Sequence, residues 1–401
     1  MDNQILKISD SVSWLGILDK DLKTFDVIMT TEYGTTYNAY FINAQKKAVV
    51  ESVKEPFFEV YEAKLRQLCN PEEIEYIIVN HTEPDHSGSL RKLLAIAPNA
   101  TIVASAAALK FLKDQIGHDF PQQLVKEGDV IDLGDKRMKV ISAPNLHWPD
   151  TIYTYLEEEQ ILFTCDSFGA HYCHPEMYDD KVGNWDDAFK YYFDVILKPF
   201  SKFYLKAIEK VRALDIKAIC PGHGPILRTR WKELIDRTEI MCQEYLVHNP
   251  DPIRVLVAYV SAYGYTKTMA SLIKEGLDSV GNIHVDFCDL EALPSEELED
   301  KISRASAYVL GSPTINQNML PQLYQVFATM TPLREKDKLA GCFGAYGWSG
   351  EAEKNLITNI ENLKLKYVGK SLFLKFRPQE IDYDRIREYG KKIGLLLKDQ
   401  S

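Results

Sequence analysis

Short apolar runs alternate with longer amphipathic stretches along most of the chain, and this alternation changes character near residue 250. Upstream, apolar runs at 76–79, 100–104 and 160–164 are separated by stretches with helical spacing. The residues from 34 to 43 have the pattern of a β-hairpin. The first part of the chain is therefore predicted to form mixed sheets covered by helices.

The second part of the chain shows a more regular succession of elements. The pattern predicts a strand at 254–260, a helix after Thr266, a strand near His284, a helix near Glu296 and a strand at 307–311. A steady alternation of strand and helix is typical of a doubly wound parallel sheet.

The boundary between the two patterns is the polar segment that starts at His248 and is twice interrupted by proline. A length of 401 residues also favours two domains or more. We therefore predict an N-terminal domain over residues 1–249 and a C-terminal domain over 250–401.

Composition limits the partners. The net charge of -11 argues against nucleic acid, because phosphate backbones require a basic face. No window approaches the about eighteen apolar residues of a membrane span, and the N-terminus lacks the features of a signal peptide. We expect a cytoplasmic protein that binds no membrane and acts on small molecules or a protein partner.

Seven cysteines are scattered along the chain, without the paired spacing of a zinc or iron–thiolate site. They are typical of reduced thiols in a reducing compartment. Each is also explained as a small buried apolar residue.

A dense group of potential metal ligands follows the apolar run at 76–79. Its four members, within six residues, are His81, Glu83, Asp85 and His86. Such ligands would sit together at the carboxyl end of a strand. Pro84 is expected to prevent a continuous helix, so that the side chains fan around a centre from a loop.

Three later segments each add one potential ligand after an apolar stretch: His147, Asp166 and His223. A single histidine near a strand end is usually hydrogen-bonded within the fold, and charged clusters usually face water. The set of four histidines and three carboxylates, in compact motifs framed by glycine and proline, is instead enough for two metal ions.

These motifs resemble the metallo-β-lactamase fold, which implies an αββα sandwich with two metals at one sheet edge. Its hydrolytic members carry His-x-His-x-Asp-His, whereas this chain has Glu83 in place of the second histidine. A mixed shell of histidine and carboxylate suits iron that cycles between two oxidation states, and zinc hydrolases favour more nitrogen. Glu83 therefore shifts the interpretation from hydrolysis to redox chemistry.

The His-x-Glu-x-Asp-His form resembles the flavodiiron proteins, and the resemblance extends over the whole chain. It implies a non-haem diiron site in two groups bridged by Asp166: His81, Glu83 and His147 for one iron, and Asp85, His86 and His223 for the other.

The resemblance also implies residues beside the metals. Tyr192 resembles a tyrosine that points into the pocket above the irons, and a buried aromatic on an amphipathic helix is an equal alternative. His171 is either a hydrogen-bonding partner of a ligand or structural. Asp26 stands where many relatives have a histidine, so the pocket beside the irons, in which a gas would bind, is expected to differ there.

Three loops of the second part carry the features of a nucleotide pocket. The first, with hydroxyls and a glycine before a helix, suits a phosphate held by backbone N–H groups. The other two follow later strands and leave room for a flat ring. Their residues are Ser261, Ala262, Tyr263, Gly264, Tyr265 and Thr266; Ser312, Pro313, Thr314, Ile315 and Asn316; and Ala345, Tyr346, Gly347, Trp348 and Gly350.

In this order and spacing the loops resemble flavodoxin, which implies a flavodoxin-like doubly wound parallel sheet that binds FMN. The setting of Trp348 matches the family position beside the flavin, although a packed aromatic also explains it.

The resemblance implies an oxidoreductase that reduces dioxygen to water or nitric oxide to nitrous oxide at the diiron site, with electrons passed through FMN. It also implies a head-to-tail homodimer or dimer of dimers, in which Trp348 of one copy lies near Glu83 of the other. No paired cysteines indicate a rubredoxin module, so an external donor is expected, either a separate rubredoxin or a reduced deazaflavin.

Two other functions stay open from the residues alone. The first is a dinuclear zinc hydrolase with a regulatory flavodoxin domain. The second is an electron carrier or redox sensor with a vestigial metal site.

Overall fold

The computed structural model describes residues 4–26, 29–246 and 252–399. The chain divides into two compact units, Met1–Leu246 and Val247–Ser401. The predicted boundary between residues 249 and 250 lies outside the described residues.

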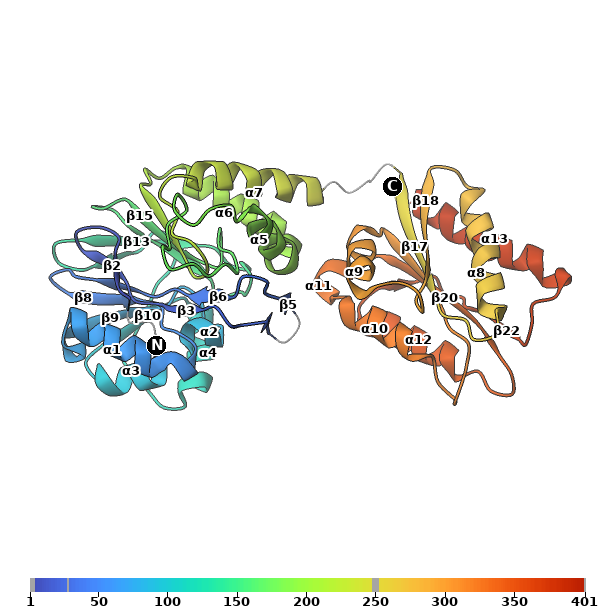
Figure 1. The fold of residues 1–401 in the computed structure, drawn as a ribbon, viewed down its shortest axis with the longest axis horizontal. Helices are drawn as coiled ribbons and strands as arrows, with labels where there is room; N and C mark the ends of the chain where they lie inside the picture. The colour runs from blue at the N-terminus through green and yellow to red at the C-terminus, as the bar shows by residue number, and fades with distance from the viewer. Residues whose placement is uncertain (1–3, 27–28, 247–251, 400–401) are drawn as a thin grey trace. The chain divides into compact units, whose positions relative to one another are not determined.

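The first unit contains two mixed sheets (Figure 1). The larger has the order β1 (Leu6–Lys7), β2 (Val12–Trp14), β7 (Tyr40–Ile42), β8 (Lys47–Val50), β9 (Ile74–Ile78), β10 (Thr101–Ala104) and β11 (Gln122–Leu124). The smaller has the order β12 (Val130–Asp132), β13 (Arg137–Ser142), β14 (Ile152–Leu156), β15 (Ile161–Cys165) and β16 (Ala218–Pro221).

Alternating apolar residues give each sheet two buried faces. In β8, Ala48 and Val50 join the core shared by the two sheets, whereas Val49 joins the core beneath the helices. The larger sheet is covered by α1 (Phe58–Leu68), α3 (Leu90–Ile96) and α4 (Ala106–Ile116).

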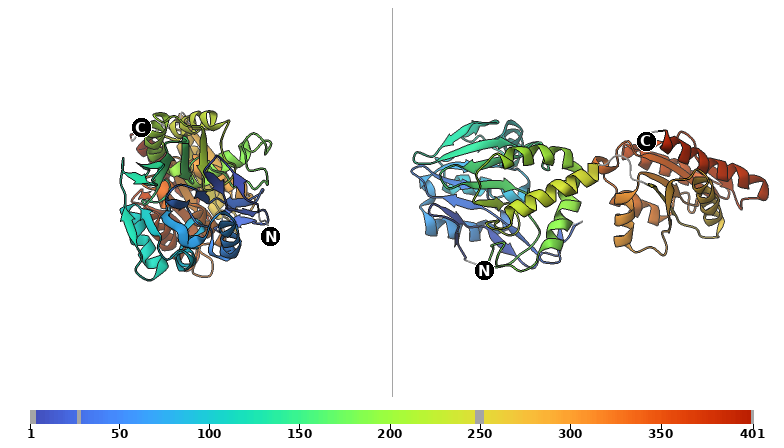
Figure 2. Two further views of the ribbon diagram at one scale, coloured as in Figure 1. Left: turned by 90° about the vertical axis from the view of Figure 1, so that its left-hand side faces the viewer. Right: turned by 90° about the horizontal axis from the view of Figure 1, so that it is seen from above.

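The smaller sheet is covered by α5 (Asp186–Tyr192), α6 (Ser201–Arg212) and α7 (Trp231–Leu246). Figure 2 shows the strands between these two sets of helices. The predicted αββα sandwich is confirmed.

The hairpin predicted for residues 34–43 is wrong. β6 (Thr35–Tyr37) pairs with β3 (Ile17–Asp19), whereas β7 pairs with β2 and β8. The reason lies at Asn38, whose backbone N–H donates to Gly222 O at 2.8 Å instead of closing a turn. The chain therefore changes sheets at Asn38, and the hairpin forms between β7 and β8.

The second unit has one parallel sheet, in the order β18 (Ile283–Asp289), β17 (Ile253–Tyr259), β19 (Ala307–Gly311), β20 (Leu339–Tyr346) and β21 (Lys366–Tyr367), with β22 (Leu372–Lys375) also paired to β20. This is the flavodoxin-like doubly wound order. The strands predicted in this part are confirmed to within a residue.

Helices cover both faces of this sheet (Figure 1). One face is packed against α8 (Tyr265–Asp278) and α13 (Glu380–Lys398), and the other against α9 (Ser295–Arg304), α10 (Pro321–Thr329) and α12 (Glu351–Asn362). Helices α8 and α13 approach so closely that a Cβ on Gly390 would lie 2.1 Å from Ile273 O. Among the helices of the described residues, none is long and apolar enough to cross a bilayer.

Candidate functional site

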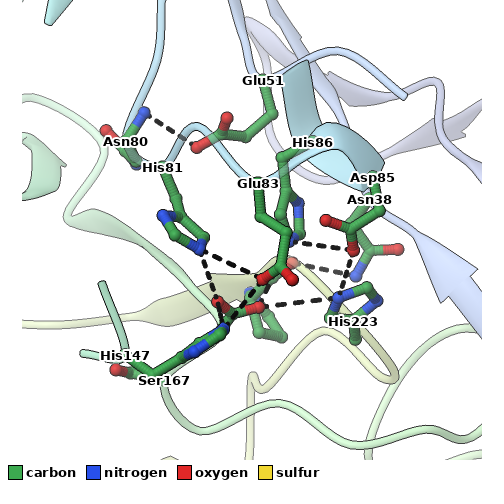
Figure 3. Close-up of polar contacts among 12 residues, drawn as sticks. Asn38, Glu51, Asn80, His81, Glu83, Asp85, His86, His147, Ser167 and His223 are labelled. Atoms are coloured by element: carbon green, nitrogen blue, oxygen red, sulfur yellow. Dashed lines mark hydrogen bonds and ion pairs between the residues drawn. The ribbon is translucent and has the colours of Figure 1, made fainter. Parts of the chain in front are cut away.

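The seven predicted metal ligands meet at one edge of the two sheets of the first unit (Figure 3). The cluster that begins at His81 follows β9, Asp166 follows β15, and His223 follows β16. His147 belongs to the connection between β13 and β14. Strand ends that share an edge thus bring together residues that are far apart in sequence.

A first group of ligands surrounds Glu83. The ligand atoms of His81, Glu83, His147 and Asp166 lie within 4.8 Å of one another. Glu83 Oε2 lies 2.8 Å from His147 Nε2 and 3.4 Å from His81 Nε2. The glutamate is therefore within reach of both histidines.

A second group contains Asp85, His86 and His223, whose ligand atoms also lie within 4.8 Å of one another. Asp85 Oδ2 is 3.0 Å from His223 Nε2 and 3.3 Å from His86 Nε2. Asp166 presents one carboxylate oxygen to each group, because Oδ2 lies 3.5 Å from His81 Nε2 and Oδ1 lies 3.2 Å from His86 Nε2.

The loop expected around Pro84 is in part a helix. Pro84 begins the single turn α2 (Pro84–Ser87), and Glu83 is its N-cap residue. Proline is favoured at the first helical position, since its missing N–H would have no partner there. Proline thus prevents a continuous helix through the cluster, as predicted, because His81 and Glu83 precede the helix, but the loop expected after it is wrong, since Asp85 and His86 are held by helical backbone.

The polar atoms at the centre fit metal ions. His81 Nε2, both carboxylate oxygens of Asp85, and Asp166 Oδ2 are buried and have no hydrogen-bond partner within the described residues. A buried polar group without a partner destabilises a fold. Four such atoms, in two groups of mixed nitrogen and oxygen ligands, are explained by two cations.

The charges of the site also indicate that it binds cations. Burial disfavours the charged form of His86, but the carboxylates of Asp85 and Asp166 outweigh it and raise its pKa to about 9. Burial would raise the pKa of Glu83, but the hydrogen bond from His147 and the nearby His81 ring hold it well below its usual value. The buried carboxylates are thus stabilised by positive charge nearby, and bound metal ions would supply this charge in place of protons on the histidines.

Asp150 is a functional residue that the sequence predictions missed. It is fully buried, and its Oδ2 accepts from the Thr82 N–H at 2.7 Å and lies 3.1 Å from His81 Nδ1. A carboxylate in this place holds the Nδ1–H tautomer and leaves Nε2 for a metal. The available signal was its place three residues after His147.

The His223 loop is held by β6 and by Asn38, the residue that follows this strand. His223 Nδ1–H donates to Thr36 O at 2.6 Å, and the Gly224 N–H donates to Thr36 Oγ1 at 2.8 Å. The buried Asn38 amide donates to Pro221 O and Gly224 O. The change of sheets at Asn38 therefore orients His223 Nε2 toward Asp85.

The second unit holds a cavity of about 400 Å³ at the carboxyl edge of its sheet. Thirteen of the predicted residues line it: Ser261, Ala262, Tyr263, Tyr265, Thr266, Pro313, Thr314, Ile315, Asn316, Ala345, Tyr346, Gly347 and Trp348. Gln317, Ser349 and Phe376 also line it and were not predicted. Within the described part of the chain, the lining carries no charged side chain.

Three predicted residues do not line this cavity. Gly264 has a left-handed φ of 78° as the N-cap of α8. Ser312 is buried and accepts a hydrogen bond from the Leu320 N–H. Gly350 precedes α12 and lines a separate shallow groove.

The first loop fits a phosphate. It leads directly into the N-terminus of α8, where backbone N–H groups and the helix dipole favour an anion. The Thr266 hydroxyl is buried there without a hydrogen-bond partner in the described residues. A phosphate oxygen would accept from it.

Comparison with known proteins assigns a family to each part of the chain. Residues 35–224 match the ODP family beta lactamase, and residues 257–390 match flavodoxin. The chain is 36% identical to the flavo-diiron protein FprA2 of Clostridium acetobutylicum, over 96% of this chain and 98% of that protein. It belongs to the flavodiiron protein family.

Two further similarities extend this result. The nitric oxide reductase of Moorella thermoacetica is 33% identical over 99% of this chain and 100% of its own length. The solved structure of rubredoxin oxygen:oxidoreductase from Desulfovibrio gigas has a TM-score of 0.73 and 28% identity, and each chain is covered to 99%. This flavodiiron protein is an oxidoreductase whose cofactors are FMN and a non-haem diiron site.

Tyr192 of this flavodiiron protein contacts the central carboxylate. Its hydroxyl donates to Asp166 Oδ1 at 3.0 Å, and its side chain is fully buried. Burial and the neighbouring charge of Asp166 raise the pKa of Tyr192 well above its usual value. The phenol therefore keeps its proton.

His171 and Asp26 border the same region. The His171 ring lies 4.8 Å from the Tyr192 ring and 5.2 Å from the His223 ring, and its Nδ1 is 2.9 Å from Thr35 Oγ1. Burial and the charge of His223 lower the pKa of His171, so this imidazole is neutral. Desolvation and the charges of Glu83 and Asp85 raise the pKa of Asp26.

Proposed function

We propose that this flavodiiron protein reduces dioxygen to water, nitric oxide to nitrous oxide, or both, at the diiron site with electrons delivered through FMN. The observation that carries the proposal is Glu83, which lies 2.8 Å from His147 Nε2 in the place of a nitrogen ligand. The Moorella relative is named for nitric oxide reduction, and the Desulfovibrio structure for oxygen reduction with rubredoxin.

We assign the ligands in two groups that share Asp166. The assignment is supported by the distances between ligand atoms and by the buried polar atoms that lack partners. The first group is His81, Glu83 and His147, and the second is Asp85, His86 and His223.

The residues around the metals have separate tasks. When bound, the iron pair and FMN together supply the electrons and open coordination positions that gas reduction requires. Asp150 Oδ2 and Thr36 O accept from the Nδ1–H groups of His81 and His223, which aims the Nε2 atoms of both rings at the centre. Tyr192 holds a proton on its hydroxyl and donates a hydrogen bond to Asp166 Oδ1, which orients the carboxylate that the two ligand groups would share.

We also propose how FMN binds in the second unit: its phosphate lies at Ser261–Thr266, and its ring lies against the two later loops. The uncharged lining and the exposed Trp348 support this placement, because a neutral flat ring is recognised by apolar surface.

We further propose a head-to-tail homodimer or dimer of dimers, with Trp348 of one copy near Glu83 of the other. Charge supports it: residues 1–246 carry 28 Lys and Arg against 38 Asp and Glu, whereas residues 247–401 carry 19 against 20. A near-neutral flavin unit meets an acidic metal unit without strong repulsion. An external donor, rubredoxin in our proposal, delivers the electrons.

A cytoplasmic location completes the proposal. Its support is the presence of five buried thiols, Cys165, Cys220, Cys242, Cys288 and Cys342.

The test is anaerobic reduction of the purified protein, followed by parallel electrode measurements of dioxygen and nitric oxide consumption. Iron and FMN are quantified on the same sample. We expect about two irons and one FMN per chain and consumption of at least one gas. Zinc without iron, together with esterase or lactamase turnover, would support the hydrolase alternative instead.

A second experiment tests the alternative of a redox sensor with a vestigial metal site. His147→Ala is expected to abolish gas consumption while FMN stays bound. Unchanged consumption would contradict the enzyme proposal.

A further inference from the structure

A fourth segment borders the FMN cavity beside the three loops. β22 runs parallel to the end of β20, with Phe373 opposite Gly344 and Lys375 opposite Tyr346. The next residue, Phe376, therefore emerges at the same carboxyl edge of the sheet. Its backbone N–H donates to Tyr346 O at 2.7 Å, and its side chain lines the cavity.

The backbone at Phe376 is held in an unfavourable conformation. Its φ is 59°, in the left-handed region that bulky residues seldom adopt. Such conformations persist where the surrounding structure imposes them, and they cluster at ligand sites. At Phe376 the hydrogen bond to Tyr346 O keeps the backbone in place, and glycine would satisfy this φ with less strain.

The ring of Phe376 lies against the third loop. A Cβ built on Gly347 would lie 3.4 Å from Phe376 Cε1, at ordinary van der Waals distance. The phenyl ring is therefore packed beside the residue that precedes Trp348.

Both aromatic side chains are left largely in water. Phe376 is 59% exposed and Trp348 is 79% exposed, although both line the cavity. Exposed aromatic rings around an uncharged cavity gain free energy when a flat aromatic ligand covers them. A strained backbone that presents a phenyl ring to such a cavity has no evident benefit for the fold itself.

We propose that Phe376 is a further flavin-binding residue, whose ring contacts the isoalloxazine ring of FMN together with Trp348. The inference rests on the proposed FMN site. It adds the segment after β22 to the three loops, and it assigns the left-handed backbone to ligand binding.

The test separates binding from folding in the full-length protein. FMN is removed, and the apoprotein is titrated with FMN while the quenching of flavin fluorescence is followed. Phe376→Gly relieves the backbone strain and removes the ring. We expect the Kd for FMN to rise about tenfold, whereas the thermal midpoint of the apoprotein stays the same or rises.

Two variants serve as controls. Phe376→Tyr keeps an aromatic ring and is expected to bind FMN with a Kd within about twofold of the parent. Leu333→Ala changes an apolar residue of α11 (Pro332–Glu335) that is 68% exposed and does not line the cavity, so its Kd is expected to be unchanged.

Two results would overturn the proposal, and they are distinguishable. If the parent binds FMN and Phe376→Gly binds it equally well, Phe376 is not a flavin-binding residue, and the proposed FMN site stands. If the parent apoprotein binds no FMN, both the proposed site and this inference fail.

Discussion

The metal site of the first unit and the flavin cavity of the second recognise their ligands by opposite means. At the metal site, charged and titratable side chains are almost fully buried, and several of their polar atoms lack partners within the described residues. At the cavity, the lining is uncharged in the described part of the chain, and its aromatic rings are exposed. An ion is recognised by buried opposite charge, and a flat ring by open apolar surface.

This contrast has an energetic cause. Burying a carboxylate without compensation costs several kcal/mol, so a site such as that of Asp166 depends on cations for its stability. The flavin cavity needs no such compensation, because backbone N–H groups and hydroxyls can hold the phosphate and solvent can cover the rest. Damage to one site is therefore expected to leave the other intact.

Removing Glu83 is expected to have the largest effect on the metal site while it leaves the flavin cavity intact. Glu83→Ala deletes the carboxylate that lies nearest to His147, so gas consumption is expected to fall roughly 100-fold or more, with loss of iron but normal FMN content. Iron, FMN and gas consumption are measured on one preparation. The exposed Glu75 of β9 supplies the matched control, Glu75→Ala, which is expected to behave as the parent. Parallel loss of FMN would show that the two sites are not independent.

Asp150→Asn tests whether hydrogen bonds behind the ligands matter. The amide keeps the size of the side chain but holds His81 in the correct tautomer less firmly, so iron affinity is expected to fall about 10- to 100-fold. A competition titration with a chelator measures it. Asp114→Asn, at an exposed position of α4, is expected to have no effect. Equal affinities for all three proteins would leave Asp150 with a structural role only.

The pH dependence of the metal-free protein tests the charge of the site. The folded-state pKa of His86 is about 9, against about 6.5 when unfolded. The stability that His86 contributes is fully present below about pH 6.5 and is lost as pH rises through about 9. Burial raises the pKa of the Glu51 carboxyl to about 8. The stability that the protonated Glu51 contributes is therefore also lost as pH rises.

Urea unfolding of the metal-free protein at pH 6.5 and pH 9 measures this effect. The free energy of unfolding is expected to be lower at pH 9 by on the order of 2 kcal/mol. The iron-loaded protein should show a smaller decline, because its ligands, His86 among them, are already deprotonated. Glu51→Gln should reduce the decline in the metal-free protein. If the metal-free protein became more stable toward pH 9, the result would contradict the buried, charged surroundings described for His86 and Glu51.

Tyr192→Phe has the smallest expected effect. It removes one hydrogen bond to Asp166 Oδ1 and leaves every ligand in place, so turnover is expected to fall roughly 3- to 10-fold at unchanged iron content. Rates of dioxygen and nitric oxide consumption are compared with those of Tyr191→Phe on the same helix. Equal rates for the two variants would remove Tyr192 from the reaction.

Much of the fold followed from local patterns. The apolar runs at 76–79 and 254–260 predict the strands that the structure has as β9 and β17, and the succession of elements after residue 252 predicts the parallel sheet. The hairpin at 34–43 was wrong because Asn38 bonds to Gly222, a contact between residues too distant for any local pattern to reveal.

The candidate metal site was predictable because its ligands are chemically unusual and follow apolar strands. The residues behind them were not, since Asp150 and Thr36 act through hydrogen bonds that exist only after the sheets have assembled. Phe376 was missed for a related reason. Its place at the cavity depends on the pairing of β22 with β20, and no motif marks it.

The most direct measurement of the central claim is anomalous diffraction at the iron absorption edge, from crystals of protein purified without oxygen. The account predicts two iron peaks in the first unit and none in the second. A single peak, or zinc at both positions, would contradict it. The two peaks should lie within the groups that share Asp166: His81, Glu83 and His147, and Asp85, His86 and His223.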